Sequence, residues 1–127
     1  MSNQSVFIEN VTKWAQAQKK ILSIILVGSQ ARGNARTDSD IDIVIITSEP
    51  ETFLSDSIWI NSLGTSKSIQ DEDWGLLKVK RVFYEDGLEV EFGITTVEWV
   101  NDKETQPILK QGFKVLWDPQ EFFKIRK

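Results

Sequence analysis

"ILSIILVGSQARGNARTDSDIDIVIIT", residues 21 to 47, contains two apolar runs separated by a polar loop. Both runs are rich in Ile and Val, which predicts buried strands over residues 21 to 27 and about 40 to 47. Acidic residues take every other position where the second run begins, at Asp38, Asp40 and Asp42. Side chains two apart on a strand point to the same side. We therefore expect Asp40 and Asp42 to share one face, while the isoleucines between and after them face the core.

Two carboxylates this close repel each other, and a bound cation removes that cost. An exposed strand end gives the same pattern, so the acid pair alone leaves both interpretations open. The chain has no His and no Cys, which excludes imidazole and thiolate ligands. A metal at this position would be a hard, oxygen-bound cation such as Mg²⁺.

The loop between the two strands has residues suited to an anion. Gly28 and Ser29 follow the first strand directly, and glycine lets a backbone approach a ligand closely. The Ser hydroxyl and the backbone N–H groups after it can hold phosphate oxygens. Arg32 and Arg36 can add charge-assisted hydrogen bonds. A tight turn into a short helix uses the same residues, so the loop alone is compatible with both.

The rest of the chain predicts helices and strands in mixed order. Helices are expected over about residues 5 to 20, 49 to 61 and 96 to 111, a loop over 65 to 73, and a short last strand over 114 to 117. Ser5 is the expected N-cap of the first helix. The 127 residues suit a single domain over 1 to 127. This order predicts an α/β or α+β fold, a small mixed sheet with flanking helices.

Residues 76 to 95, LLKVKRVFYEDGLEVEFGIT, predict a β-hairpin that turns at Asp86-Gly87. A two-residue turn there would pair Val82 with Glu91. One face of the second strand is then apolar and belongs to the core: Leu88, Val90, Phe92 and Ile94.

The opposite face of that strand carries Glu89 and Glu91. If the hairpin lies beside the second strand of the chain, Glu91 approaches the acid pair as a third carboxylate. Glu89 is nearer the turn and is expected to be an exposed strand acid. The same register places Lys80 opposite Gly93, where the missing side chain leaves room for a ligand.

Three segments together resemble the DNA polymerase β-like nucleotidyltransferase superfamily. They are LVGSQARG at 26 to 33, SDIDIVI at 39 to 45 and LEVEFGI at 88 to 94. The superfamily pattern is an apolar strand, Gly-Ser, a loop, a strand with two acids and a later strand with a third. The form of the motifs is most similar to small and aminoglycoside-type nucleotidyltransferases, which implies the nucleotidyltransferase fold.

The resemblance also implies roles for the site residues. Asp40, Asp42 and Glu91 would be the catalytic residues and the ligands of two Mg²⁺ ions. A nucleoside triphosphate, with ATP as donor of AMP, would bind at Gly28, Ser29, Arg32 and Lys80. The acceptor hydroxyl would belong to a small molecule or a partner protein. The third acid is Glu where many relatives have Asp, which makes its role as a tight ligand the least secure of the three.

Two other classes of function remain open from the sequence. One is a nucleotide-binding module without turnover, and the other is an antitoxin-like domain that acts through a helical partner protein. A nucleic-acid polymerase is disfavoured, because the net charge is −4 and there is no basic domain to hold a strand.

Location and partners follow from composition. No apolar run approaches a membrane span of roughly 20 residues, and the start lacks the pattern of a secretory signal. With no Cys, a cytoplasmic location is expected. The aminoglycoside-modifying enzymes that the sequence resembles usually carry a helical C-terminal domain that builds the acceptor site. None fits after residue 127, so a homodimer or a helical partner is expected to complete that site. Tryptophan favours interfaces, and three of the five lie in or beside segments expected to flank the site: Trp59, Trp74 and Trp99.

Overall fold

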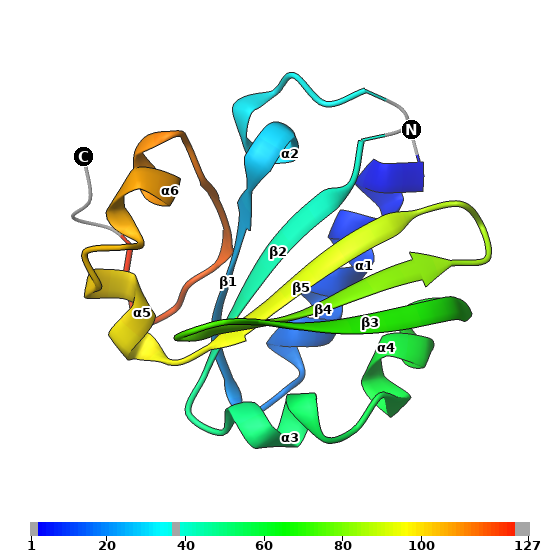
Figure 1. Ribbon diagram of the computed structural model, residues 1–127, viewed down its shortest axis with the longest axis horizontal. Coiled ribbons are helices and arrows are strands. Elements are labelled where there is room, and N and C mark those ends of the chain that lie inside the picture. The colour runs from blue at the N-terminus through cyan, green and yellow to red at the C-terminus, as the bar shows by residue number, and fades with distance from the viewer. Residues whose placement is uncertain (1–2, 37–38, 124–127) are drawn as a thin grey trace.

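The computed structural model describes residues 3–36 and 39–123, so Asp38 lies outside the described residues. It contains a six-stranded sheet with strand order β3-β4-β5-β2-β1-β6 (Figure 1). The strands β2 and β5 are parallel, and all other neighbours are antiparallel. The strands are β1 Ile21–Val27, β2 Ile41–Thr47, β3 Ser66–Trp74, β4 Leu77–Tyr84, β5 Glu89–Thr95 and β6 Lys114–Trp117. The predicted mixed sheet with flanking helices is confirmed.

Helices cover both faces of this sheet. They are α1 Asn3–Gln16, α2 Gly28–Arg32, α3 Pro50–Leu54, α4 Ile58–Ser62, α5 Val97–Asn101 and α6 Gln106–Lys110. One apolar cluster joins α1, α3 and α4 to one face of the sheet, and a second joins α5 and α6 to the other. The apolar stripe of α1 is buried at Phe7, Val11 and Ala15. Ser5 lies inside α1, because the helix already includes Asn3, so the predicted N-cap is wrong.

Two predicted helices are each divided in two. Between α3 and α4, the Asp56 carboxylate accepts a hydrogen bond from the N–H of Ile58 at 2.9 Å. Between α5 and α6, Asp102 is extended with φ −69° and ψ 141°. Aspartate favours such local turns over helix continuation. Among the described residues, no helix is long and apolar enough to cross a membrane.

The segment expected as a loop, 65 to 73, is largely the strand β3. It is an edge strand of the sheet, and most of its side chains are exposed. Polar residues are usual on edge strands because they discourage pairing with other chains. The polar composition of SKSIQDEDW therefore does not indicate a strand, although the segment pairs with β4 along almost its whole length.

The hairpin register differs by one residue from the predicted one. Tyr84 donates its N–H to the carbonyl of Leu88 at 2.8 Å, which leaves a three-residue loop instead of a two-residue turn. Gly87 at the end of that loop has φ +97°, the left-handed conformation that such loops require. Arg81, rather than Val82, is therefore the partner of Glu91. A shift of one residue exchanges the faces of β4.

Candidate active site

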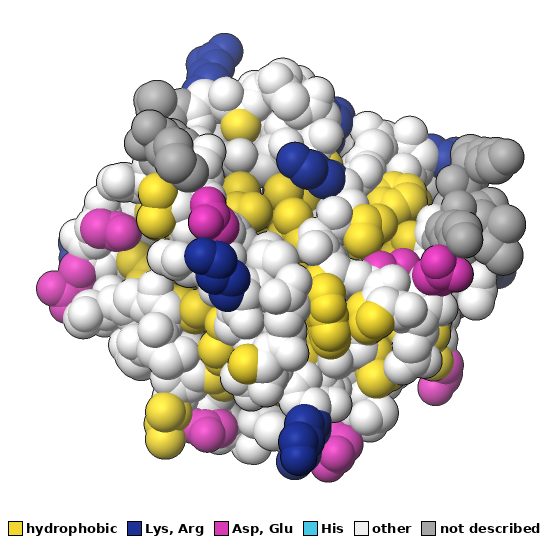
Figure 2. All heavy atoms as spheres, turned by 180° about the vertical axis from the view of Figure 1, so that it is seen from behind, with side chains coloured by type: hydrophobic (Ala, Val, Ile, Leu, Met, Phe, Trp, Pro, Cys, Tyr) yellow, Lys and Arg dark blue, Asp and Glu magenta, His cyan; other side chains and the backbone are white. Residues whose placement is uncertain are grey.

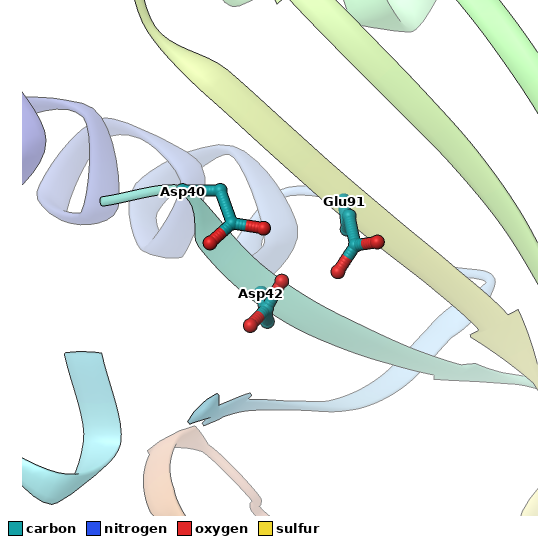
Figure 3. A group of neighbouring side chains, drawn as sticks. All are labelled: Asp40, Asp42 and Glu91. Carbon is teal, nitrogen blue, oxygen red and sulfur yellow. The ribbon is translucent and has the colours of Figure 1, made fainter. Parts of the chain in front are cut away.

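Three carboxylates meet on the face of the sheet covered by α5 and α6. Asp40 immediately precedes β2, and Asp42 lies in β2 directly beside Glu91 of the parallel strand β5. Their side chains point toward one another (Figure 3), and one oxygen from each lies within 4.8 Å of the others. The structure thus brings together the three acids predicted from the sequence.

The Asp42 carboxyl is strongly perturbed by its surroundings. Burial, followed by the nearby carboxylates of Glu91 and Asp40, raises the pKa of Asp42 to about 9. Its Oδ1 atom is buried and has no hydrogen-bond partner among the described residues. A buried carboxylate oxygen that accepts no hydrogen bond lowers the stability of the fold. A bound cation would give this oxygen a partner and would also relieve the repulsion among the three carboxylates. Three carboxylates are also the ligand type that Mg²⁺ prefers, so these residues fit the predicted metal.

Gly28 makes room for this carboxylate. A Cβ atom placed on Gly28 would lie 2.2 Å from Asp42 Oδ2, and the residue has φ +73°. Both the space and the backbone conformation therefore require glycine. Gly28 begins the short helix α2, which also contains Ser29 and ends with Arg32. Ser29 is partly buried and Arg32 is exposed, and their roles as triphosphate ligands remain predictions.

The placement of Lys80 in the site is wrong. In the observed register Lys80 pairs with Phe92 and faces the other side of the sheet. Lys80 is 4% exposed, and its ammonium donates to the Asp71 carboxylate at 2.8 Å. The space beside Gly93 is also occupied, because a Cβ atom there would lie 2.8 Å from Leu77 Cδ1.

Arg81 lies opposite Glu91, where the predicted register placed Val82. Its guanidinium contacts the Glu91 carboxylate, donates to Glu72 at 3.0 Å and to Glu89 at 2.8 Å, and lies 4.0 Å from Asp40. The pKa of Arg81 is raised, chiefly by its hydrogen bond to Glu72. The site therefore contains one fixed positive charge among its acids. Glu89, expected to be an exposed acid, is one of the partners of this charge.

The family model for streptomycin adenylyltransferase matches residues 1–127. This chain belongs to that family. It is a nucleotidyltransferase-superfamily domain, so the predicted superfamily is confirmed, and the family that it belongs to is one of adenylyltransferases.

Solved structures of low sequence identity share the fold of this family domain. An aminoglycoside 6-adenyltransferase from Bacillus subtilis matches with a TM-score of 0.58 and 15% identity, over 85% of this chain and 38% of that one. The Cid1 poly(U) polymerase matches with a TM-score of 0.51 and 11% identity, over 87% of this chain and 35% of that one. The chain thus spans little more than a third of either structure. A search of curated proteins found no match.

In this nucleotidyltransferase domain, a side chain of α1 supports the loop that leads to the acids. Gln4 is 7% exposed, and its amide donates to the carbonyls of Arg36 at 3.0 Å and Ser39 at 2.7 Å. The Ser39 hydroxyl in turn accepts the N–H of Arg36 at 2.8 Å. These bonds hold the backbone immediately before Asp40.

We expect Gln4→Ala to lower the free energy of unfolding by about 1–3 kcal/mol, because two carbonyls lose a largely buried donor. Urea denaturation measures this change. Gln16→Ala is the matched control, because Gln16 is exposed on the same helix and its removal should change stability by under about 0.5 kcal/mol. Equal effects of the two variants would contradict the supporting role of Gln4.

An open pocket adjoins the acids of this domain. Its volume is about 230 Å³, and its wall includes Asp42 and Glu91 at the acidic end and the apolar residues Leu77, Val79 and Trp99. Trp74, 54% exposed, lies at the same pocket. The pocket thus offers an apolar surface beside a charged one.

The tryptophans of the domain have different environments. Trp59 is buried on the far face of the sheet and stacks on Trp14, with ring centroids 5.3 Å apart. The prediction that Trp59 flanks the site is therefore wrong, because α4 packs against α1 and the opposite face. Trp74 and Trp99 do lie beside the acids, at the pocket. Trp14 and Trp117 are partly buried and pack against the apolar cluster of that far face.

Proposed function

We propose that this domain transfers a nucleoside monophosphate, AMP from ATP, onto the hydroxyl of an acceptor, with Mg²⁺ held by Asp40, Asp42 and Glu91. The observation that carries the proposal is the convergence of three carboxylates within 4.8 Å around a buried oxygen of Asp42 that has no partner in the described part of the chain. Membership of an adenylyltransferase family supports the same reaction.

The reaction needs charge neutralisation and positioning more than covalent help. Bound Mg²⁺ supplies neutralisation of the triphosphate and of the three acids. Gly28 and Ser29 bind the phosphates with the help of Arg32. The Glu91 carboxylate accepts the proton of the acceptor hydroxyl, whose oxygen forms a bond to the α-phosphorus while the bond to pyrophosphate breaks. Pyrophosphate leaves, and the acceptor carries the nucleotide.

The pocket beside the acids suits the organic part of a substrate, because it joins an apolar wall to the carboxylates. We propose a small hydroxylated molecule as the acceptor. Aminoglycosides are the first class to test, because one structural neighbour is an aminoglycoside 6-adenyltransferase. Trp74 and Leu76 are exposed at the adjoining rim. A second copy, a helical partner or a further domain packed there would enclose the acceptor.

We also propose the cytoplasm as the location.

Nucleic acid is the less favoured acceptor. The net charge is −4, and binding to a phosphate backbone needs clustered Lys and Arg. On the face shown in Figure 2, the Lys and Arg side chains of the described residues are scattered among apolar and acidic ones. A small molecule or a protein hydroxyl is therefore the better candidate.

The direct test is incubation of the protein with each labelled triphosphate, Mg²⁺ and either purified aminoglycosides or a cell extract. We expect label from the α-phosphate of ATP to appear on one acceptor, with release of pyrophosphate. Nucleotide binding without any transfer would favour the binding-module alternative, and label on a single helical protein would favour the partner-directed one.

Thermal melting tests the metal site without an acceptor. We expect Mg²⁺ and ATP together to raise the melting temperature more than the sum of their separate effects, because each neutralises charge on the other. Asp42→Asn should abolish the metal-dependent part. In a chelator this variant should melt no lower than the wild type, because the amide resembles the protonated carboxyl that the raised pKa of Asp42 implies.

Glu51→Gln provides the control, because Glu51 is an exposed acid of α3, a helix that packs on the other side of the sheet. It should respond to Mg²⁺ and ATP as the wild type does. An unchanged metal response in Asp42→Asn would remove the basis for the proposed metal site.

A further inference from the structure

Arg81 is held in place by acids that do not belong to the carboxylate trio. Its Nε donates to Glu72 of β3 at 3.0 Å, and its Nη1 donates to Glu89 of β5 at 2.8 Å. Its side chain is 22% exposed. A guanidinium is planar and offers donors in fixed directions. Because Nε and Nη1 are both held, the direction in which the remaining nitrogen, Nη2, points is fixed.

That direction leads to the trio. Nη2 contacts Oε1 of Glu91, and Nη1 lies 4.0 Å from Oδ2 of Asp40. The positive charge thus lies against two of the three carboxylates that the proposed function assigns to Mg²⁺. A divalent cation between those carboxylates would lie only a few ångströms from a guanidinium that cannot lose its proton. Like charges at such a distance repel strongly, because the site is partly buried.

We infer that Arg81 is a positioning residue that competes with the divalent cation for Glu91: it neutralises and orders the trio when no metal is bound, and it weakens metal binding. This inference rests on the proposed function. Because Glu72 and Glu89 retain the guanidinium, entry of a cation has to displace only its contact with Glu91. The Arg81 side chain therefore stabilises the metal-free fold and lowers the affinity for the metal.

The test is Mn²⁺ binding to the purified chain without nucleotide, measured by isothermal titration and by the loss of the free Mn²⁺ paramagnetic signal. We expect Arg81→Gln to bind Mn²⁺ about tenfold more tightly than the wild type, because a fixed positive charge is removed. In a chelator the same variant should melt about 5 °C lower, because Glu72, Glu89 and Glu91 lose their shared positive partner. Arg81→Lys keeps the charge, and its Mn²⁺ affinity should stay within about threefold of the wild type.

Lys78→Gln is the matched control for net charge. Lys78 lies on the same strand, faces the other side of the sheet and pairs with Asp73 at 2.6 Å, so its removal should leave Mn²⁺ affinity unchanged. The double variant Arg81→Gln, Asp42→Asn should lose the tight binding. If it keeps tight binding, the cation lies on Glu72 and Glu89 instead, and the inference is wrong.

The remaining outcomes separate the inference from the proposed function. Absence of Mn²⁺ binding in the wild type and in all variants would overturn the metal site itself. Mn²⁺ binding by the wild type that is equal or weaker in Arg81→Gln would overturn the inference alone. If Arg81→Gln is unfolded in the chelator, refolding on addition of Mn²⁺ supports the competition, whereas a chain still unfolded at saturating Mn²⁺ shows that Arg81 is only a structural clamp.

Discussion

Glu91→Gln is expected to reduce the rate of nucleotide transfer by about 10³-fold or more while leaving the melting temperature within a few degrees of the wild type. Gln has the same shape as Glu, and its amide oxygen can still lie against the Arg81 guanidinium, which now contacts the Glu91 carboxylate. The variant loses the negative charge that the proposal assigns to metal binding and proton transfer. The measurement is single-turnover transfer of labelled AMP to the acceptor that the wild type labels.

Glu89→Gln is the control for this result. Glu89 lies two residues away on the same strand and the same face, and it also contacts Arg81, but it does not belong to the trio of acids. We expect its rate to fall by less than about tenfold, since only the anchoring of the guanidinium is weakened. If Glu89→Gln were the more damaging variant, Glu91 would not be the third acid of the site.

The trio itself could be predicted because it depends on alternation along strands and not on loop geometry. The bounds of β1, Ile21–Val27, agree with the predicted strand, and β2 begins one residue after its predicted start. Asp40 and Asp42 share a face on any strand with this sequence. The parallel pairing of β2 with β5 then places Glu91 beside Asp42, as expected if the hairpin lay next to the second strand.

Arg81 was missed because the loop of the hairpin is one residue longer than expected. The sequence does contain a signal for the correct register. The predicted pairing put Val82 and Tyr84 on the same face as two glutamates, whereas cross-strand neighbours on one face normally match in polarity. The observed register pairs Val82 with Val90 and Arg81 with Glu91. Matching apolar with apolar residues would have selected it over the two-residue turn.

The spacing of apolar residues could not predict the edge strand or the division of the two helices. In β3 only Ile69 and a terminal tryptophan interrupt a run of polar residues, because an edge strand with two largely solvated faces needs no apolar alternation. The breaks at Asp56 and Asp102 depend on single side-chain hydrogen bonds to nearby backbone N–H groups. Such local bonds change the course of the chain without altering the spacing of its apolar residues.

Gly28→Ala should be the most damaging substitution of a residue that carries no functional group. The new Cβ atom would lie 2.2 Å from Asp42 Oδ2, far inside any permitted contact, so the carboxylate must move out of the trio. We expect Mn²⁺ affinity and nucleotide transfer to fall by at least about 10²-fold, because a shift of roughly 1 Å in a catalytic group has effects of that size. Isothermal titration and the transfer assay measure the two losses separately.

Gly33→Ala separates this clash from backbone strain. Gly33 caps the C-terminal end of α2 with φ +78°, close to the +73° of Gly28, but a Cβ atom placed there meets no atom within 4 Å. Both variants carry the strain of a left-handed non-glycine residue, about 1–2 kcal/mol, so both should lose similar backbone stability. Only Gly28→Ala should lose the metal. Equal loss of Mn²⁺ affinity in the two variants would mean that α2 acts through its backbone conformation, and that the space left beside Asp42 is not what the site requires.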